Sequence, residues 1–290
     1  MIERLLGEFP LRRFIDEYYL RQPFSLPQAA ASFKHLGDWA VVESILAQPD
    51  ADVLVVKEGR RWEGSRQPSA HEARQLFDDG YTVLVRHAER CHAQVAELAA
   101  GFERDFAAAI DVHLYCTPGN QHGFGWHYDA EDVFILQTAG SKEYSLRKNT
   151  VNPWPVVEAL PQDMRYEREI MPLAKCLLSA GDWLYVPHGY WHKAEAHEAA
   201  FSLAVGVMNA TALDLLDFMR RRLPDAIRWR QRLPVVGTAS PLSEEELIAE
   251  HNQLFTELGA DLARLLRDER LAQDWLASRR RASPDEPPAA

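Results

Sequence analysis

The feature that most constrains the fold is a run of short strands between Ile110 and Asn209, separated by glycine, proline and asparagine. The segments that read as strands are 111–116, 125–129, 132–138, 142–147, 176–178, 183–186, 191–196 and 200–207. Many short, punctuated strands are typical of a β-sandwich or a jelly roll. Gly140-Ser141 separates two of these strands, and this dipeptide predicts a hairpin.

Helical and strand patterns alternate before this run. Residues 52–57 and 81–86 read as buried strands, and a helix begins near Ser69. Residues 91–106 predict an amphipathic helix, because their apolar residues recur at helical spacing. We therefore expect residues 1–209 to form one mainly-β domain with an α/β elaboration at its N-terminus.

After Asn209 the strand pattern ends and helical spacing takes over. The sequence Ser243-Glu244-Glu245-Glu246 fits a capping box. An apolar stripe follows at helical spacing, made of Leu254, Phe255, Leu258, Leu262, Leu265 and Leu266. This stripe either packs on its own domain or forms a dimer interface. The expectation is a helical C-terminal region over 210–281, with a role in dimerisation under the second reading, and a disordered, proline-containing tail over 282–290.

Composition narrows the classes of partner and compartment. A net charge of −11 disfavours nucleic acid, whose phosphates are bound by Lys and Arg, but is compatible with a basic protein. The three cysteines, Cys91, Cys116 and Cys176, form no CxxC pair and indicate reduced thiols. The first residues lack the pattern of a signal peptide, and no stretch approaches the roughly 20 apolar residues of a membrane span. We expect a soluble, cytoplasmic protein.

His127, Asp129 and His192 form a candidate metal site within the strand run. Residues i and i+2 of a strand point to the same face, so His127 and Asp129 can bind one ion from one side. An isolated HxD pair is common by chance, but His192 follows the tight turn 187–189, where it can point into a barrel mouth. Two imidazoles and one carboxylate leave the opposite side of the metal open, which suits non-haem Fe(II) oxygen chemistry.

Four motifs, in this order and at this spacing, resemble the JmjC (cupin-like) 2-oxoglutarate oxygenases, and most closely the bacterial ribosomal-oxygenase-type branch. The motifs lie at 123–129, 132–137, 140–142 and 181–192, and the resemblance covers about residues 100–210 well. It implies a double-stranded β-helix and makes His127, Asp129 and His192 the ligands of Fe(II). It also implies 2-oxoglutarate as the cosubstrate, which is decarboxylated to succinate and CO2 while a substrate is hydroxylated. No catalytic residue beyond the metal ligands is expected.

The same resemblance implies roles for three cavity residues. Lys142 stands where the family carries the cation for the distal carboxylate of 2-oxoglutarate, and a buried dianion needs a cationic partner. The alternative is an exposed lysine after a turn. Tyr115 corresponds to a tyrosine of the cosubstrate or substrate pocket, although a core aromatic fits the pattern equally well. Ser202 would add a hydroxyl near the same carboxylate, but Ala204 replaces a second hydroxyl residue that related enzymes often carry.

The expected function is a 2-oxoglutarate-dependent dioxygenase that hydroxylates a protein or peptide side chain, with a ribosomal or another basic protein as partner. Lysine demethylation is a second outcome of the same chemistry, because hydroxylation of an N-methyl group releases formaldehyde. Competing classes are a non-catalytic cupin that binds a metal or small ligand, and a small-molecule or nucleotide hydroxylase on the same fold. Lys142 discriminates against the binding-only class, which has no need of a cation there. His113 shares strand parity with Tyr115 and could face the pocket, although a packed neutral histidine is the simpler interpretation.

Overall fold

The computed structural model describes residues 1–64, 67–161 and 164–281. The chain divides into two compact units, Met1–Asn209 and Ala210–Ala290. The tail predicted to be disordered, 282–290, lies outside the described residues. Within the ranges that are described, no helix is long and apolar enough to cross a membrane.

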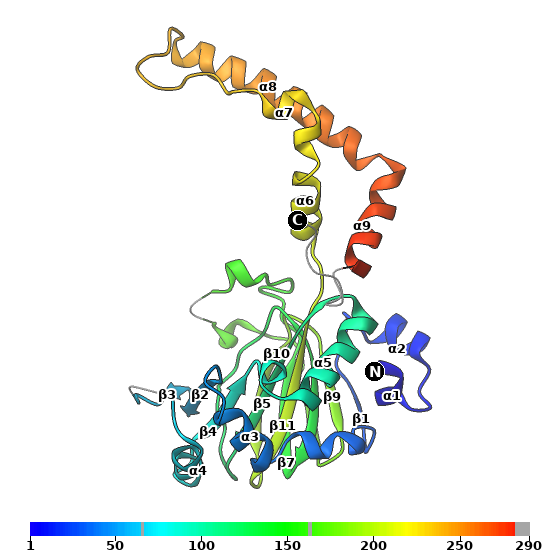
Figure 1. Cartoon of the computed structure of the whole chain (residues 1–290), viewed down its shortest axis with the longest axis vertical. Helices are drawn as coiled ribbons and strands as arrows, with labels where there is room; N and C mark the ends of the chain where they lie inside the picture. The colour runs from blue at the N-terminus through cyan, green and yellow to red at the C-terminus, as the bar shows by residue number, and fades with distance from the viewer. Residues whose placement is uncertain (65–66, 162–163, 282–290) are drawn as a thin grey trace. The chain divides into compact units, whose positions relative to one another are not determined.

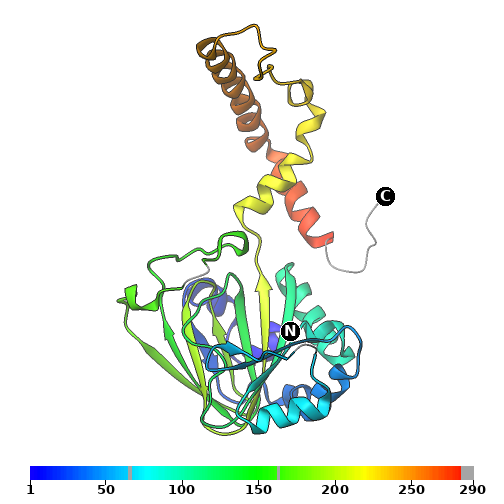
Figure 2. The same ribbon diagram turned by 90° about the vertical axis from the view of Figure 1, so that its left-hand side faces the viewer.

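The first unit is built on two antiparallel sheets, which Figures 1 and 2 show as the layers at its centre. The large sheet has the order β1 (Phe24–Leu26), β9 (Trp183–Val186), β6 (Asp132–Ala139), β11 (Ala200–Met208), β5 (Ala109–Thr117), β4 (Thr82–Arg86), β2 (Asp52–Lys57) and β3 (Arg60–Arg61). The small sheet has the order β10 (Trp191–Ala196), β7 (Ser141–Arg147) and β8 (Ala174–Ser179). This is the mainly-β architecture that the strand pattern predicts.

Helices from the N-terminal part cover the outer face of the large sheet (Figures 1 and 2). The helices of this unit are α1 (Ile2–Leu6), α2 (Leu11–Glu17), α3 (Trp39–Leu46), α4 (Ala70–Asp78) and α5 (Ala93–Phe106), and the short 3-10 turns are Ala31–Leu36, Ala88–Arg90, Val157–Ala159 and Tyr166–Arg168. Residues of α1, α3 and α5 share one apolar core with alternate residues of the large sheet.

The alternating direction of side chains along the strands determines which residues face the site. On β5, Val112, Leu114 and Cys116 are buried in the helix-covered core. Successive side chains of a strand point to opposite faces, so His113 and Tyr115 point toward the small sheet. A second apolar cluster, which includes Ile135, Leu146 and Leu178, joins the two sheets on that side. The space between the sheets is therefore part core and part cavity.

The predicted hairpin at Gly140-Ser141 is wrong. Strand β6 pairs with β9 and β11, whereas β7 pairs with β10 and β8, so the chain crosses here from one sheet to the other. Gly140 has a φ of +64°, and a Cβ atom at this position would overlap the carbonyl oxygen of Ala199. A glycine is required because both the backbone conformation and the close approach exclude a side chain. The dipeptide Gly140-Ser141 correctly predicted a turn, but it did not predict which strand β7 pairs with.

The second unit contains α6 (Ala212–Arg220), a 3-10 turn (Leu223–Asp225), α7 (Ile227–Arg230), α8 (Glu244–Leu266) and α9 (Glu269–Arg281). The capping box at the start of α8 is present: Ser243 and Glu246 each accept the backbone N–H of the other. The exposed fractions of Phe255 and Leu266 on α8 are 58% and 50%. The stripe is therefore not fully covered within this chain, and its role in dimerisation stays a prediction.

Candidate metal centre and its cavity

The fold brings His127, Asp129 and His192 together. The predicted strand 125–129 is reduced to a bridge between His127 and His192, which exchange backbone hydrogen bonds of 3.1 and 2.8 Å. The backbone carbonyl of Asp129 accepts the N–H of Gly189 at 2.8 Å and so fixes the turn that leads to His192. One potential ligand atom from each of the three side chains lies within 4.8 Å of the other two.

Backbone carbonyls orient both imidazoles. His127 Nδ1 lies 2.9 Å from the carbonyl oxygen of Gly125, and His192 Nδ1 lies 3.0 Å from that of Tyr190. A carbonyl can only accept, so each Nδ1 carries the proton and each Nε2 presents its lone pair. The Nε2 of His192 is 3.4 Å from Asp129 Oδ2. Burial, and next the neighbouring His127, lower the pKa of His192 to about 4, so this imidazole is neutral near pH 7.

These residues fit a divalent metal with open coordination positions. Among the described residues, no fourth histidine, cysteine, aspartate or glutamate joins the group. A closed four-ligand site could not bind a further reactant, whereas three ligands on one side leave room for it. Two imidazoles and one carboxylate are the donor set of non-haem Fe(II) oxygenases. The geometry therefore favours a catalytic over a structural metal.

A buried carboxylate holds the elements around this site. Asp132, at the start of β6, is 1% exposed and accepts hydrogen bonds from the Tyr185 hydroxyl and from the backbone N–H of His188. Asn209 Nδ2 donates to the other oxygen of Asp132 at 2.8 Å. The turn that carries the chain into β10, and so to His192, is thus fixed to a strand of the opposite sheet.

The three candidate ligands open into a cavity of about 250 Å³ between the two sheets. It is lined by Thr82, Leu84, His113, Tyr115, Thr117, Gly123, Phe124, His127, Asp129, Glu131, Val133, Ile135, Lys142, Tyr144, His192, Ala194, Ser202, Ala204 and Gly206. Every residue singled out from the sequence as a ligand or cosubstrate contact belongs to this one cavity.

Lys142 is a buried cation without a counter-ion. Its side chain is 3% exposed, so it is not the exposed lysine of the alternative interpretation. Its Nζ donates to Ser202 Oγ at 3.0 Å, and no carboxylate of the described residues lies within ion-pair distance. Burial lowers the pKa of Lys142 from 10.5 to about 8. A cation that the protein buries but does not neutralise fits an anionic ligand in the cavity.

The remaining predicted contacts lie beside Lys142. Its Nζ is 5.5 Å from the ring centroid of Tyr115, and Ser202 is 2% exposed. Ala204 also lines the cavity, so the small residue leaves that part of the wall apolar. Sequence reasoning missed Tyr144, which is 5% exposed and lines the cavity as well. The sequence could have indicated Tyr144, because it follows Lys142 by two positions on the same strand and so points to the same face.

Glu131 is a second residue that the sequence reasoning missed. It lines the cavity two positions after Asp129. Burial, followed by the negative charge of Asp129, raises the pKa of Glu131 to about 7. A Cβ atom at Gly206 would overlap its carboxylate, so this glycine makes room for the acid on β11. His113 also faces the cavity, contrary to the simpler interpretation of a packed core histidine.

Comparison with known proteins agrees with this geometry. Residues 85–215 match the model of the JmjC domain. The chain is similar to the bifunctional lysine-specific demethylase and histidyl-hydroxylase NO66 of Drosophila sechellia, with 26% identity over 68% of this chain and 32% of the relative. It is similar to ribosomal oxygenase 1 of Gallus gallus, with 31% identity over 55% of this chain and 28% of the relative. The chain thus spans about a third of the length of these curated relatives.

The fold is similar to that of a solved structure, YcfD, a ribosomal oxygenase from Escherichia coli, in complex with cobalt and 2-oxoglutarate. The TM-score is 0.56 and the identity 17%, over 96% of this chain and 73% of that one. This likeness and the domain match confirm the predicted resemblance and the predicted double-stranded β-helix.

Proposed function

Because the chain carries a JmjC domain at residues 85–215, we propose that it is an Fe(II)- and 2-oxoglutarate-dependent oxygenase that hydroxylates a protein side chain. The observation that carries this proposal is the pairing of two features in one cavity: three metal donors on one side and the unneutralised Lys142 on another. A metal-binding protein without a cosubstrate needs the donors but not the buried cation.

Each residue has a part in the proposed reaction. His127, Asp129 and His192 would hold the iron, and bound Fe(II) would supply the coupling of O2 activation to the decarboxylation of 2-oxoglutarate. Lys142 and Ser202 would bind the distal carboxylate, because a charge-assisted hydrogen bond is stronger than a neutral one. The carbonyls of Gly125 and Tyr190 hold the Nδ1 atoms of both imidazoles, which would leave the Nε2 atoms free to bind the metal.

A protein substrate is supported by the surface and by the charge. The segment between β7 and β8 carries exposed apolar side chains in its described part: Trp154 is 70% exposed and Ile170 86%. Exposed apolar side chains that gather in one segment are typical of interaction sites. The net charge of −11 favours a basic partner. Relatives are named ribosomal oxygenase, histidyl-hydroxylase and lysine-specific demethylase, so a ribosomal protein and a side chain of one of these kinds are the first candidates.

The test is succinate formation from 2-oxoglutarate with Fe(II) and ascorbate. We expect slow turnover without substrate, its loss in His127→Ala, and strong impairment in Lys142→Met. Lys148→Met is the matched control, because Lys148 is a nearby exposed lysine. Absence of succinate, together with absence of a 2-oxoglutarate-dependent thermal shift under Mn(II), would show a binding protein instead.

Peptide screening then assigns the reaction. Intact mass spectrometry of basic peptides should show the gain of one oxygen atom, whereas a demethylase should release formaldehyde from an N-methylated lysine peptide. Gain of oxygen by small metabolites or nucleotides but by no peptide would contradict the protein substrate.

We also propose that the helical region forms a homodimer. The support is the exposed apolar surface of this region, which includes Ile248, Phe255 and Leu266 at 55%, 58% and 50% exposure. A helix face of this kind is stable in water when it is buried against a second surface. Sedimentation analysis should give a dimer for the full chain and a monomer for Phe255→Glu. A monomeric parent chain would contradict this proposal.

A further inference from the structure

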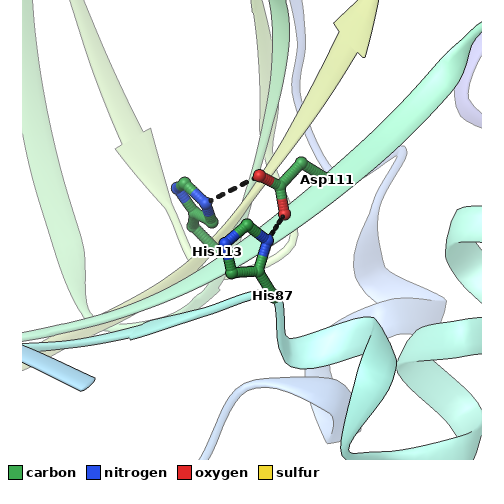
Figure 3. A group of neighbouring side chains, drawn as sticks. All are labelled: His87, Asp111 and His113. Atoms are coloured by element: carbon green, nitrogen blue, oxygen red, sulfur yellow. Dashed lines mark hydrogen bonds and ion pairs between the residues drawn. The ribbon is translucent and has the colours of Figure 1, made fainter. Parts of the chain in front are cut away.

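A second group of metal-binding side chains lies outside the site described above. His87, Asp111 and His113 place one potential ligand atom each within 4.8 Å of the other two. Figure 3 shows Asp111 between the two imidazoles, with one carboxylate oxygen directed at each ring. The chemistry proposed for the first site uses none of these three residues.

Two neighbouring strands of the large sheet position this group. Asp111 and His113 are residues i and i+2 of β5, so both point to the face that carries the cavity. His87 directly follows β4, the strand that pairs with β5. The design repeats that of the first site, where an acid and a histidine two positions apart are joined by a histidine from a separate segment. The DxH sequence at 111–113 is therefore a signal equal in kind to the HxD at 127–129.

The distances suit direct coordination. His87 Nδ1 lies 2.7 Å from Asp111 Oδ1, and His113 Nε2 lies 3.3 Å from Asp111 Oδ2. Two donor atoms that are each about 2.1 Å from one tetrahedral ion are about 3.4 Å apart. The ring centroids of His87 and His113 are 5.8 Å apart with the planes at 87°. Small movements of the side chains would place all three donors around one ion.

A buried ring nitrogen that makes an ion pair with Asp111 but no hydrogen bond points to a ligand at this place. His113 Nε2 is inaccessible to solvent and has no hydrogen-bond partner of acceptable geometry within the described part of the chain, despite its proximity to Asp111. A buried polar atom without a partner is costly, and a bound metal would satisfy it.

The surroundings support a cation as well. His87 Nε2 lies 3.8 Å from Asp52 Oδ2, and Asp52 is held by Arg86 at 2.7 Å. A carboxylate behind the second nitrogen of an imidazole is the usual way to orient a histidine ligand. The side chains of His87, Asp111 and His113 are 29%, 22% and 24% exposed, so the group lies near the surface.

We propose that His87, Asp111 and His113 form a second divalent-metal site of the zinc class, with water as a fourth ligand. Its donors are two imidazoles and one carboxylate, which Zn(II) accepts in tetrahedral geometry with an open position for water. His113 lines the cavity, so the second ion would lie at the wall of the same cavity. The proposal does not depend on the oxygenase activity.

The experiment measures Zn(II) and Co(II) stoichiometry on the full chain in which the first site is removed. The parent for this test is His127→Ala/His192→Ala, so that the second site is observed alone. We expect one ion per chain, with the strong visible absorption of four-coordinate Co(II), and its loss on addition of His87→Ala or Asp111→Asn. His71→Ala, at an exposed histidine on α4, is the matched control and should keep the ion. Far-UV circular dichroism monitors the fold of each variant.

Each result decides the proposal. One ion in the double variant and in the control, and none after His87→Ala or Asp111→Asn in a folded protein, supports it. No ion in a folded double variant, or an ion that survives both substitutions, overturns it. If the double variant does not fold, the wild-type chain is titrated instead, and two ions that fall to one in His87→Ala support the site, whereas one ion in both overturns it.

Discussion

Replacement of Lys142 by methionine should make the protein more stable and its cosubstrate binding weaker. Lys142 is charged below pH 8 and is buried with no carboxylate of the described residues within ion-pair distance. A fall of its pKa from 10.5 to about 8 corresponds to about 3 kcal/mol of unfavourable charge burial, at about 1.36 kcal/mol per pH unit. Methionine is close in volume and carries no charge. Because the substitution also removes the donor to Ser202, we expect a net stabilisation of about 1–3 kcal/mol in the free protein at pH 7.

The sign of the pH dependence follows from proton linkage. Between pH 8 and 10.5 the unfolded wild type binds more protons at residue 142 than the folded one does. The unfolding free energy of the wild type should therefore rise with pH across this window, and the advantage of Lys142→Met should shrink. Urea denaturation of both proteins at pH 7 and pH 9.5, without metal or cosubstrate, measures this difference.

Binding should change in the opposite direction. Loss of the cation beside the distal carboxylate of 2-oxoglutarate should disfavour binding by about 3–5 kcal/mol, which is roughly two to four orders of magnitude in Kd. Calorimetry with 2-oxoglutarate under Mn(II) measures this loss, and Lys148→Met should bind as the wild type does. The reasoning is refuted if Lys142→Met is less stable than the wild type at pH 7 and binds 2-oxoglutarate with unchanged affinity.

Three further outcomes test other parts of the structure. The affinity of the wild type for 2-oxoglutarate should fall about tenfold from pH 7 to pH 9, because a Lys142 with a pKa of about 8 loses its charge over this range. Calorimetry at both pH values measures this change, and the affinity of Lys142→Met should not depend on pH. A wild-type affinity that is equally independent of pH would contradict the role of Lys142. Gly140→Ala should lower the unfolding free energy by about 2–4 kcal/mol in urea titrations, because its Cβ meets a backbone carbonyl at positive φ. A change under about 0.5 kcal/mol would show that the alanine fits without strain where the chain crosses from β6 to β7. Ser243→Ala should reduce helix stability by about 1 kcal/mol in thermal unfolding followed by circular dichroism, through loss of the N-cap of α8, and an unchanged melting curve would speak against the capping box.

Local patterns in the sequence identified most elements but not their partners. The short segments separated by glycine, proline and asparagine located most strands of the jelly roll, and Ser243 located the start of α8. The error at Gly140-Ser141 has a different cause. A turn signal reports the local backbone, whereas the sheet that receives the next strand is decided by long-range pairing, here of β7 with β8 and β10.

In the candidate site, too, local patterns identified some residues, whereas others depend on long-range packing. The HxD spacing and the turn before His192 indicated a shared metal site, and the family resemblance implied the same three ligands, although residues 125–129 form only a bridge and no strand. The local pattern alone did not show the burial of Lys142, since a lysine after a turn is normally solvated, and only the resemblance to the JmjC family implied it. Glu131 was missed because its position in the cavity depends on Gly206, which no local pattern reports. For His113 strand parity indicated the cavity, but the alternative of a packed neutral histidine was preferred.

We propose that His127, Asp129 and His192 share one divalent ion beside the cavity that also contains Lys142. A crystal structure with Mn(II) and 2-oxoglutarate tests it most directly. We expect an anomalous peak about 2.0–2.3 Å from all three side chains, with the distal carboxylate of 2-oxoglutarate on Lys142 Nζ. Anomalous density away from these three residues, or a fourth protein atom in the coordination sphere, would contradict it.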